Sequence, residues 1–200
     1  MATDSPYPVT VTGELDPNLS RWLWLVKWLL VIPHVIVLFF LWIAFLVLTI
    51  VAFFAILFTG RYPRGIFDFN VGVMRWTWRV GFYSYSALAT DRYPPFSLQR
   101  RDYPADLEVE YPEQLSRGRV LVKWWLLAIP HYIVVGFLSG ASNGGLTFVL
   151  TIFSAVAVLF GRRYPADIFE LVIGFNRWTF RVLAYASLMR DEYPPFRLSP

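Results

Sequence analysis

Residues 28–60 read WLLVIPHVIVLFFLWIAFLVLTIVAFFAILFTG, and residues 124–161 read WWLLAIPHYIVVGFLSGASNGGLTFVLTIFSAVAVLFG. Neither stretch contains Asp, Glu, Lys or Arg, and each is longer than the roughly 20 residues that one membrane-spanning helix needs. Each stretch follows a lysine, Lys27 or Lys123, and ends at a basic loop, Gly60–Arg64 or Gly161–Pro165. These stretches predict an all-α integral membrane protein.

The composition favours the same class of protein. Hydrophobic residues make up 56% of the chain and charged residues 16%, a balance that does not suit a soluble domain. The net charge is +4, and the basic residues cluster beside the apolar stretches, so we expect anionic lipid and not nucleic acid as the partner. The absence of cysteine excludes disulfides, thiolate metal sites and cysteine nucleophiles. The first residues lack a basic segment followed by an apolar core, so no cleavable signal peptide is expected.

The chain consists of one unit written twice, with the repeats predicted at residues 1–100 and 101–200. Four motifs recur in the same order. They are Leu-Ser-Arg at 19–21 and 115–117, Lys-Trp followed by Ile-Pro-His at 27–34 and 123–131, Arg-Trp-Thr-x-Arg at 75–79 and 177–181, and Tyr-Pro-Pro-Phe at 93–96 and 193–196. The polar segments 9–12 and 107–110 alternate in the manner of short strands that pair with each other.

Each apolar stretch is predicted to form a helical hairpin, at residues 22–59 and 119–160. The second stretch is interrupted by the turn-forming residues 139–145, and the equivalent turn in the first stretch is expected near Leu41–Ala44. The basic loops should remain cytoplasmic, as should Lys27 and Lys123, so each stretch crosses an even number of times. A rival interpretation breaks the first stretch at Pro33 and gives a single span over 34–58.

Amphipathic helices are predicted after the basic loops, at residues 65–89 and 166–190. On a helix, Arg75 and Arg79 share a narrow stripe in the first repeat, as do Arg177 and Arg181 in the second, while tryptophan and other apolar residues cover the remaining surface. We expect these helices to lie in the membrane interface with the arginines reaching lipid phosphate. The competing interpretation is a further membrane-spanning helix whose stripe faces the protein interior.

The candidate lipid-binding residues are basic, because the guanidinium fork matches phosphate geometry. Anchoring of a helix without lipid preference is the alternative role. The predicted headgroup ligands are Arg75, Arg79, Arg177, Arg181, Arg61, Arg64, Arg162 and Arg163.

The two histidines, His34 and His131, occupy the same place in each repeat, beside a proline. One interpretation is a haem or pigment site, in which the two imidazoles meet across a pseudo-twofold axis. The alternative is that each imidazole satisfies backbone groups freed at the proline kink. No nucleophile–base pair, phosphate loop or metal-spaced cluster accompanies the histidines, so neither a catalytic residue, a metal site nor a bound cofactor is predicted.

These motifs, in this order and in two tandem copies, resemble the bacterial membrane family called domain of unknown function 4389. The resemblance covers nearly the whole chain. It implies a bacterial membrane protein and implies no activity.

From these observations, we expect a non-enzymatic membrane scaffold that binds anionic lipid at the cytoplasmic leaflet and shapes or organises the membrane. The expected location is the bacterial cytoplasmic membrane, with several crossings and both termini cytoplasmic. An accessory subunit of a larger membrane complex is the alternative function, haem or pigment binding is a further one, and a homo-oligomer remains open.

Overall fold

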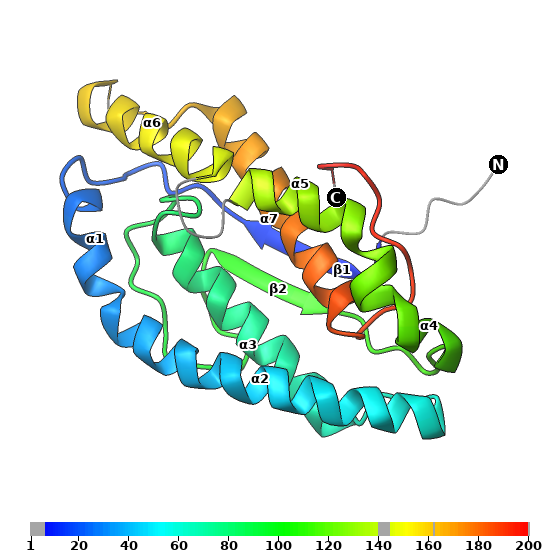
Figure 1. The fold of residues 1–200 in the computed structure, drawn as a ribbon. Coiled ribbons are helices and arrows are strands. Elements are labelled where there is room, and N and C mark those ends of the chain that lie inside the picture. The colour runs from blue at the N-terminus through cyan, green and yellow to red at the C-terminus, as the bar shows by residue number, and fades with distance from the viewer. Residues whose placement is uncertain (1–6, 140–144, 162, 200) are drawn as a thin grey trace.

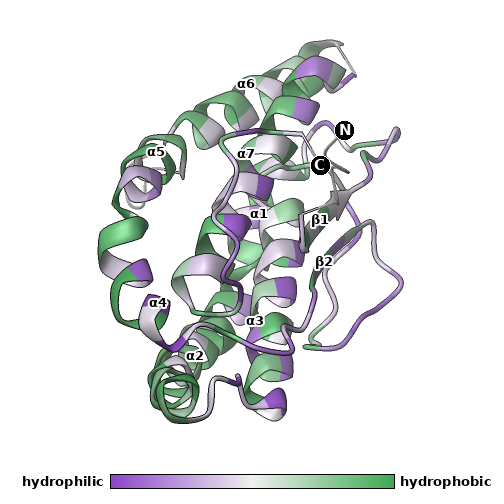
Figure 2. Cartoon of the chain, turned by 90° about the vertical axis from the view of Figure 1, so that its right-hand side faces the viewer, coloured by the Kyte–Doolittle hydropathy of each residue, from purple (hydrophilic) through white to green (hydrophobic). Residues whose placement is uncertain are grey.

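The computed structural model describes residues 7–139, 145–161 and 163–199, which form three layers (Figures 1 and 2). The middle layer contains α3 (Arg64–Tyr83) and α7 (Ala166–Ala186), and a ribbon of β1 (Val9–Gly13) and β2 (Ala105–Val109) covers one side of it. The outer layer lies on the other side. It contains α1 (Trp24–Leu30), α2 (Ile32–Thr59), α4 (Arg117–Val122), the π-helix η1 (Lys123–Leu127), α5 (Ile129–Ser139) and α6 (Leu146–Gly161).

Proline and glycine set the ends of the longest helix and of its neighbours. Pro33 occupies the first turn of α2, where its missing N–H costs no helical hydrogen bond. Gly60 ends α2 with a left-handed backbone, at a φ of 73°. Pro63 and Pro165 then precede α3 and α7 with extended backbones. The predicted amphipathic helices are therefore present, but they end at Tyr83 and Ala186, earlier than expected.

The two strands pair antiparallel, from Val9 opposite Val109 to Gly13 opposite Ala105, which confirms the predicted pairing of the polar segments. Val9, Val11, Leu107 and Val109 point inward and are buried. The strands are exchanged between the repeats, because β2 packs on α3 and β1 packs on α7. The main core therefore lies between the ribbon and the two middle helices and belongs to both repeats.

The predicted hairpin in the first repeat is wrong. No turn occurs near Leu41–Ala44, since α2 runs without a break for 28 residues. The rival interpretation, a break beside Pro33 followed by one long helix, describes this repeat. The predicted turn depends on the glycine-rich insert of the second repeat, which the first repeat lacks.

In the second repeat, α5 and α6 both pack on α7, in the way that α2 packs on α3. Figures 1 and 2 show α6 leading onward from the end of α5 along the outer layer, so the two helices correspond to two halves of α2 and do not run back along each other. Residues 140–144, on which most of the predicted turn falls, lie outside the described residues. A bend of 45° also separates residues 117–127 from 129–138.

The outer helices of the two repeats run antiparallel. The end of α2 meets the start of α4, where the Leu115 N–H donates to the Gly60 carbonyl at 2.8 Å. The end of α6 returns to the first repeat, where the Tyr164 hydroxyl donates to the Ala87 carbonyl at 2.8 Å. The two basic loops therefore lie at opposite ends of the outer layer (Figure 1).

Among the described residues, α2 is the one unbroken helix that is long and apolar enough to cross a membrane. Only 17% of its most apolar window is buried within the protein. The bent pair formed by residues 117–127 and 129–138 passes the same test when it is taken as one span.

Candidate functional site

Each histidine lies in an aromatic cluster built by its own repeat. Trp76 donates its indole N–H to Nδ1 of His34 at 3.0 Å, and Phe96 stacks on the imidazole with ring centroids 3.9 Å apart. Tyr93 covers the same imidazole at 4.9 Å between centroids. The Tyr-Pro-Pro-Phe motif therefore folds back from the end of the repeat to enclose the histidine.

The second repeat reproduces this cluster. Trp178 donates to Nδ1 of His131 at 3.2 Å, and Phe196 stacks on the ring at 4.4 Å. Tyr193 lies 4.7 Å from the imidazole.

The geometry of the histidines does not fit the alternative interpretation of a haem or pigment site. Because Nδ1 of each ring accepts a hydrogen bond, the neutral ring carries its proton on Nε2. Both Nε2 atoms are buried without a hydrogen-bond partner, and both histidines are 0% exposed. Neither nitrogen of either ring has a lone pair open to a metal. The two imidazoles do not meet across an axis. Each accepts a hydrogen bond from a tryptophan indole N–H, and neither binds a backbone group freed at the proline kink.

The arginine stripe points into the protein. Arg79 is 0% exposed and donates to the carbonyls of Ser97 at 3.2 Å and Gln99 at 2.8 Å. Arg181 is 2% exposed and donates to Arg197 at 3.2 Å and Ser199 at 2.9 Å. The segment at the end of each repeat, residues 91–101 or 191–199, is called the tail. Each of these two arginines holds the tail of its own repeat against the middle helix.

The other two stripe arginines join the repeats. The Arg75 guanidinium donates to the Leu107 carbonyl at 2.9 Å and lies 3.1 Å from the Asp106 carboxylate. Arg177 donates to the Val11 carbonyl at 3.2 Å. Each arginine therefore binds the strand that the opposite repeat contributes.

The predicted interfacial position of these helices is consequently wrong. Trp76, Trp78 and Phe82 of α3 are buried, at 6%, 0% and 0% exposure, between the outer helices and the ribbon. The stripe faces the protein interior, as the competing interpretation expected. Each of the four arginines donates to backbone carbonyls of the same chain, and Arg75 also pairs with the Asp106 carboxylate.

The basic loops remain on the surface. Arg61 and Arg163 are exposed, and the Arg64 side chain is 67% exposed. Arg64 lies 3.4 Å from the Asp68 carboxylate and over the Tyr111 ring. Arg162 lies outside the described residues. Phosphate binding by the three described arginines stays a prediction.

Two buried ion pairs are absent from the predicted site residues, because the sequence pattern predicts that both lysines lie on the cytoplasmic side of the apolar stretches. Lys27 is 1% exposed and lies 2.9 Å from Asp91, and Lys123 is 0% exposed and lies 2.8 Å from Asp191. Burial lowers the pKa of Lys27, and the hydrogen bond and charge of Asp91 oppose that shift. The signal was present in the sequence, since each lysine and each aspartate recurs at equivalent positions.

A buried tyrosine links the first basic loop to α3. Tyr62, in the first basic loop, is 1% exposed and accepts a hydrogen bond from the Asn70 amide at 3.0 Å. Burial raises the pKa of the Tyr62 hydroxyl to about 12.

In the part of the chain that the structure describes, no group of three or more His, Cys, Asp or Glu side chains could hold a metal ion.

The comparisons with known proteins identify a family. A family model described as "Domain of unknown function (DUF4389)" matches residues 18–97 and 119–197. The two matched segments show the duplication and fall on either side of residue 100. No curated protein and no solved structure matches the chain.

Proposed function

We propose that this chain, which belongs to the DUF4389 family and contains two tandem copies of its domain, is a non-enzymatic scaffold embedded in one leaflet of a membrane. In this arrangement α2, α5 and α6 lie along the membrane. The apolar surface of the outer layer, called the apolar layer below, is immersed in the acyl chains of the lipid. The ribbon faces the aqueous side, which we place at the cytoplasm. Insertion into one leaflet enlarges that leaflet and provides the physical basis for organising or bending the membrane.

The observation that carries the proposal is the exposed apolar surface of the outer layer. On α2, Phe40 is 63% and Phe58 is 73% exposed. On α5 and α6, Phe137 is 71% and Phe160 is 80% exposed. Contiguous apolar surface of this kind is unfavourable in water and typical of contact with lipid or with another protein.

The opposite side of the protein is charged. The side chains of Arg100 and Glu108 are 63% and 57% exposed and form an ion pair at 2.7 Å on the outer face of the ribbon. Asp102, in the loop before β2, is 97% exposed. Figure 2 places the mainly apolar α2 and α5 on one side of the molecule and the ribbon on the other.

This division favours helices that lie along the membrane over helices that cross it. The charged ribbon runs beside the middle helices, so an upright orientation would place its ionised groups at the depth of the acyl chains, which costs several kcal/mol. An upright orientation would also put one basic loop on each side of the membrane, because α2 and α6 run antiparallel, contrary to the positive-inside rule.

A scaffold role fits the way in which the chain uses its polar groups. The repeated arginines, histidines and lysines bind other parts of the same chain. Arg61, Arg64 and Arg163 are the described members of the predicted headgroup set that remain at the surface. We assign the binding of anionic lipid to these three residues.

The test is cysteine accessibility after the two basic loops. Gly65 is exposed with no atom within 4 Å of an added Cβ, and Ala166 is exposed at the equivalent place in the second repeat. The chain has no native cysteine, so Gly65→Cys and Ala166→Cys report on single sites. In intact cells both sites should resist an impermeant maleimide, and in inside-out vesicles both should react.

If one of the two sites reacts in intact cells and the other reacts only in inside-out vesicles, the outer helices cross the membrane. That result would overturn the in-plane arrangement. Thr10→Cys, on the exposed face of β1, provides the control for the side that the ribbon faces. Release of the wild-type protein from membranes by alkaline carbonate would contradict membrane embedding altogether.

An accessory subunit is the second candidate function, and a polar cavity of about 460 Å³ favours it. The cavity lies beside the end of β1. Its lining residues are Thr12, Glu14, Leu15, Asp16, Pro17, Thr90, Arg92, Asp102, Tyr103 and Pro104. A photo-crosslinking residue at Asp102 should capture one partner at a fixed ratio in native membranes, whereas the same residue at Thr10 should not. Equal capture at both positions would remove this candidate.

A further inference from the structure

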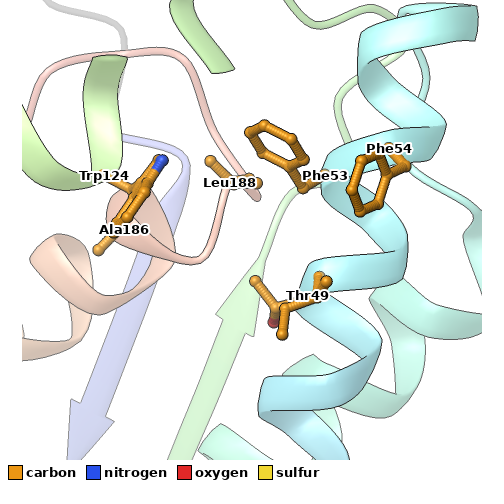
Figure 3. Close-up of a pocket in the computed structure, with 7 residues that line it drawn as sticks. Thr49, Phe53, Phe54, Trp124, Ala186 and Leu188 are labelled. Carbon is orange, nitrogen blue, oxygen red and sulfur yellow. The ribbon is translucent and has the colours of Figure 1, made fainter. Parts of the chain in front are cut away.

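An apolar cavity of about 310 Å³ lies where the first repeat meets the second (Figure 3). The second half of α2 forms one wall, and η1 and the end of α7 form the other. The lining residues are Thr49, Ile50, Phe53, Phe54, Trp124, Ala186 and Leu188. Figure 3 shows Phe53 and Leu188 facing each other across this space.

The walls of the cavity suit a hydrocarbon chain. Thr49 is the one lining residue with a hydroxyl, and its oxygen already accepts a hydrogen bond from the Asn70 amide at 3.2 Å. No charged side chain lines the cavity, so a buried carboxylate or phosphate would have no cationic partner. The space holds about ten groups of methylene size, since a group as large as a water molecule takes about 30 Å³.

The mouth of the cavity opens on the apolar layer. Ile50 and Phe54 are each 52% exposed and belong both to the cavity wall and to the outer surface of α2. A chain entering here would come from the hydrocarbon in which the outer layer lies under the proposed function. Its headgroup would stay outside, since the lining offers it no charge.

On the other side of the protein, α1 and α6 meet beside Leu88 and leave a space of only about 10 Å³, which Trp24 also lines. This space lies at a different point of the seam from the open cavity, because Trp28 and Ser86, the counterparts of Trp124 and Ala186, do not line it. Leu88 and Leu188 occupy equivalent places and share a positive φ, 52° and 68°, so the backbone turn is common to both seams. The difference between the seams lies in the side chains and in η1, which has no counterpart in the first repeat.

We infer that the open cavity holds one acyl chain of a membrane phospholipid, bound between α2, η1 and the end of α7. This inference rests on the proposed membrane embedding. The bound chain would link the outer helix of one repeat to the middle helix of the other.

The test uses the full-length protein in vesicles of phosphatidylglycerol and phosphatidylethanolamine. One phospholipid carries a diazirine in the middle of an acyl chain, and peptide mass spectrometry locates the adducts after irradiation. We expect adducts on Phe53 and Leu188 in the cavity and on Phe40 at the outer surface. Leu188 is the diagnostic position, because it lines the cavity from the side of α7 and does not belong to the apolar outer surface that free lipid covers.

Ala186→Phe fills the cavity from the α7 side. Adducts on Phe53 and Leu188 should fall about tenfold, the change in binding expected when about two methylene groups are displaced. Adducts on Phe40 should stay unchanged. Ala166→Phe makes the same change at the exposed start of α7 and should leave all three sites labelled. Ile50→Trp fills the cavity from α2 and gives a second reading if Ala186→Phe does not fold.

Adducts on Phe40 without adducts on Leu188 would overturn the cavity inference and leave the membrane proposal intact. Undiminished labelling of Leu188 in both filled variants would overturn it as well. The absence of adducts at every site would contradict the membrane proposal itself. Stronger labelling of Leu188 by a diazirine fatty acid than by the phospholipid would contradict the assignment to phospholipid.

Discussion

Each repeat buries one lysine and binds it with an aspartate from its own tail. The Lys27 amine also donates to the Thr90 carbonyl at 2.6 Å, and Lys123 donates to the Arg190 carbonyl at 3.0 Å. Neutral acceptors and one carboxylate together replace the water that the ammonium group loses on burial. The outer helix is thereby tied to the segment that follows the middle helix.

Removing one partner of this pair should be more harmful than removing both. Asp91→Asn should lower the free energy of unfolding by about 3 kcal/mol, because Lys27 keeps its charge without a counterion. The double variant Lys27→Met with Asp91→Asn should recover most of that loss. Chemical denaturation in detergent micelles, followed by circular dichroism, measures both effects.

The exposed pair of Arg64 and Asp68 provides the matched control, since its members are 67% and 59% exposed. Arg64→Gln should change stability by less than about 0.5 kcal/mol. An Asp91→Asn variant as stable as this control would show that the buried pair has no structural role.

At the scale of elements, the middle helices depend on close contact with the tails. Gly72 of α3 and Gly174 of α7 face Leu98 and Leu198, and an added Cβ would lie 2.8 Å from the leucine Cβ in each case. The absence of a side chain at both glycines lets the tails lie against the helices. From there the tail carbonyls reach Arg79 and Arg181.

Gly72→Ala should therefore loosen the first tail and cost about 1–3 kcal/mol, the usual range for overpacking. Limited proteolysis should cut the variant within residues 91–101 faster than the wild type. Gly65→Ala is the control on the same helix, because nothing lies within 4 Å of its added Cβ. It should be neutral or stabilise α3 by up to about 1 kcal/mol. Equal proteolysis of the two variants would contradict the packing role of Gly72.

At the scale of the whole molecule, the exchanged strands make the repeats interdependent. Arg75 and Arg177 each bind the strand of the opposite repeat, and both strands contribute to one core. Each middle helix is covered mainly by the strand of the opposite repeat. The apolar layer and the charged ribbon, on opposite sides of this shared core, then determine how the protein meets a membrane.

Leu107→Ala tests this interdependence, because Leu107 is 0% exposed on β2. The substitution should cost about 2–5 kcal/mol. Hydrogen exchange in α3 and in α7 should rise together, although the altered strand packs mainly on α3. Thr10→Ala, on the exposed face of β1, should leave both helices protected. Faster exchange in α3 alone would show that the repeats unfold independently.

Sequence alone determined the duplication, the long apolar stretches, the starts of the two helices after the basic loops, and the stripe of arginines, because these features depend on residues close together in the chain. The tertiary structure decided where the stripe points, since the carbonyls around Arg79 come from Ser97 and Gln99, and the partner of Arg177 is Val11. It also decided that α2 is unbroken and that the outer helices run antiparallel. Such choices depend on which distant surfaces pack together, and hydrophobic periodicity contains no information about the partner.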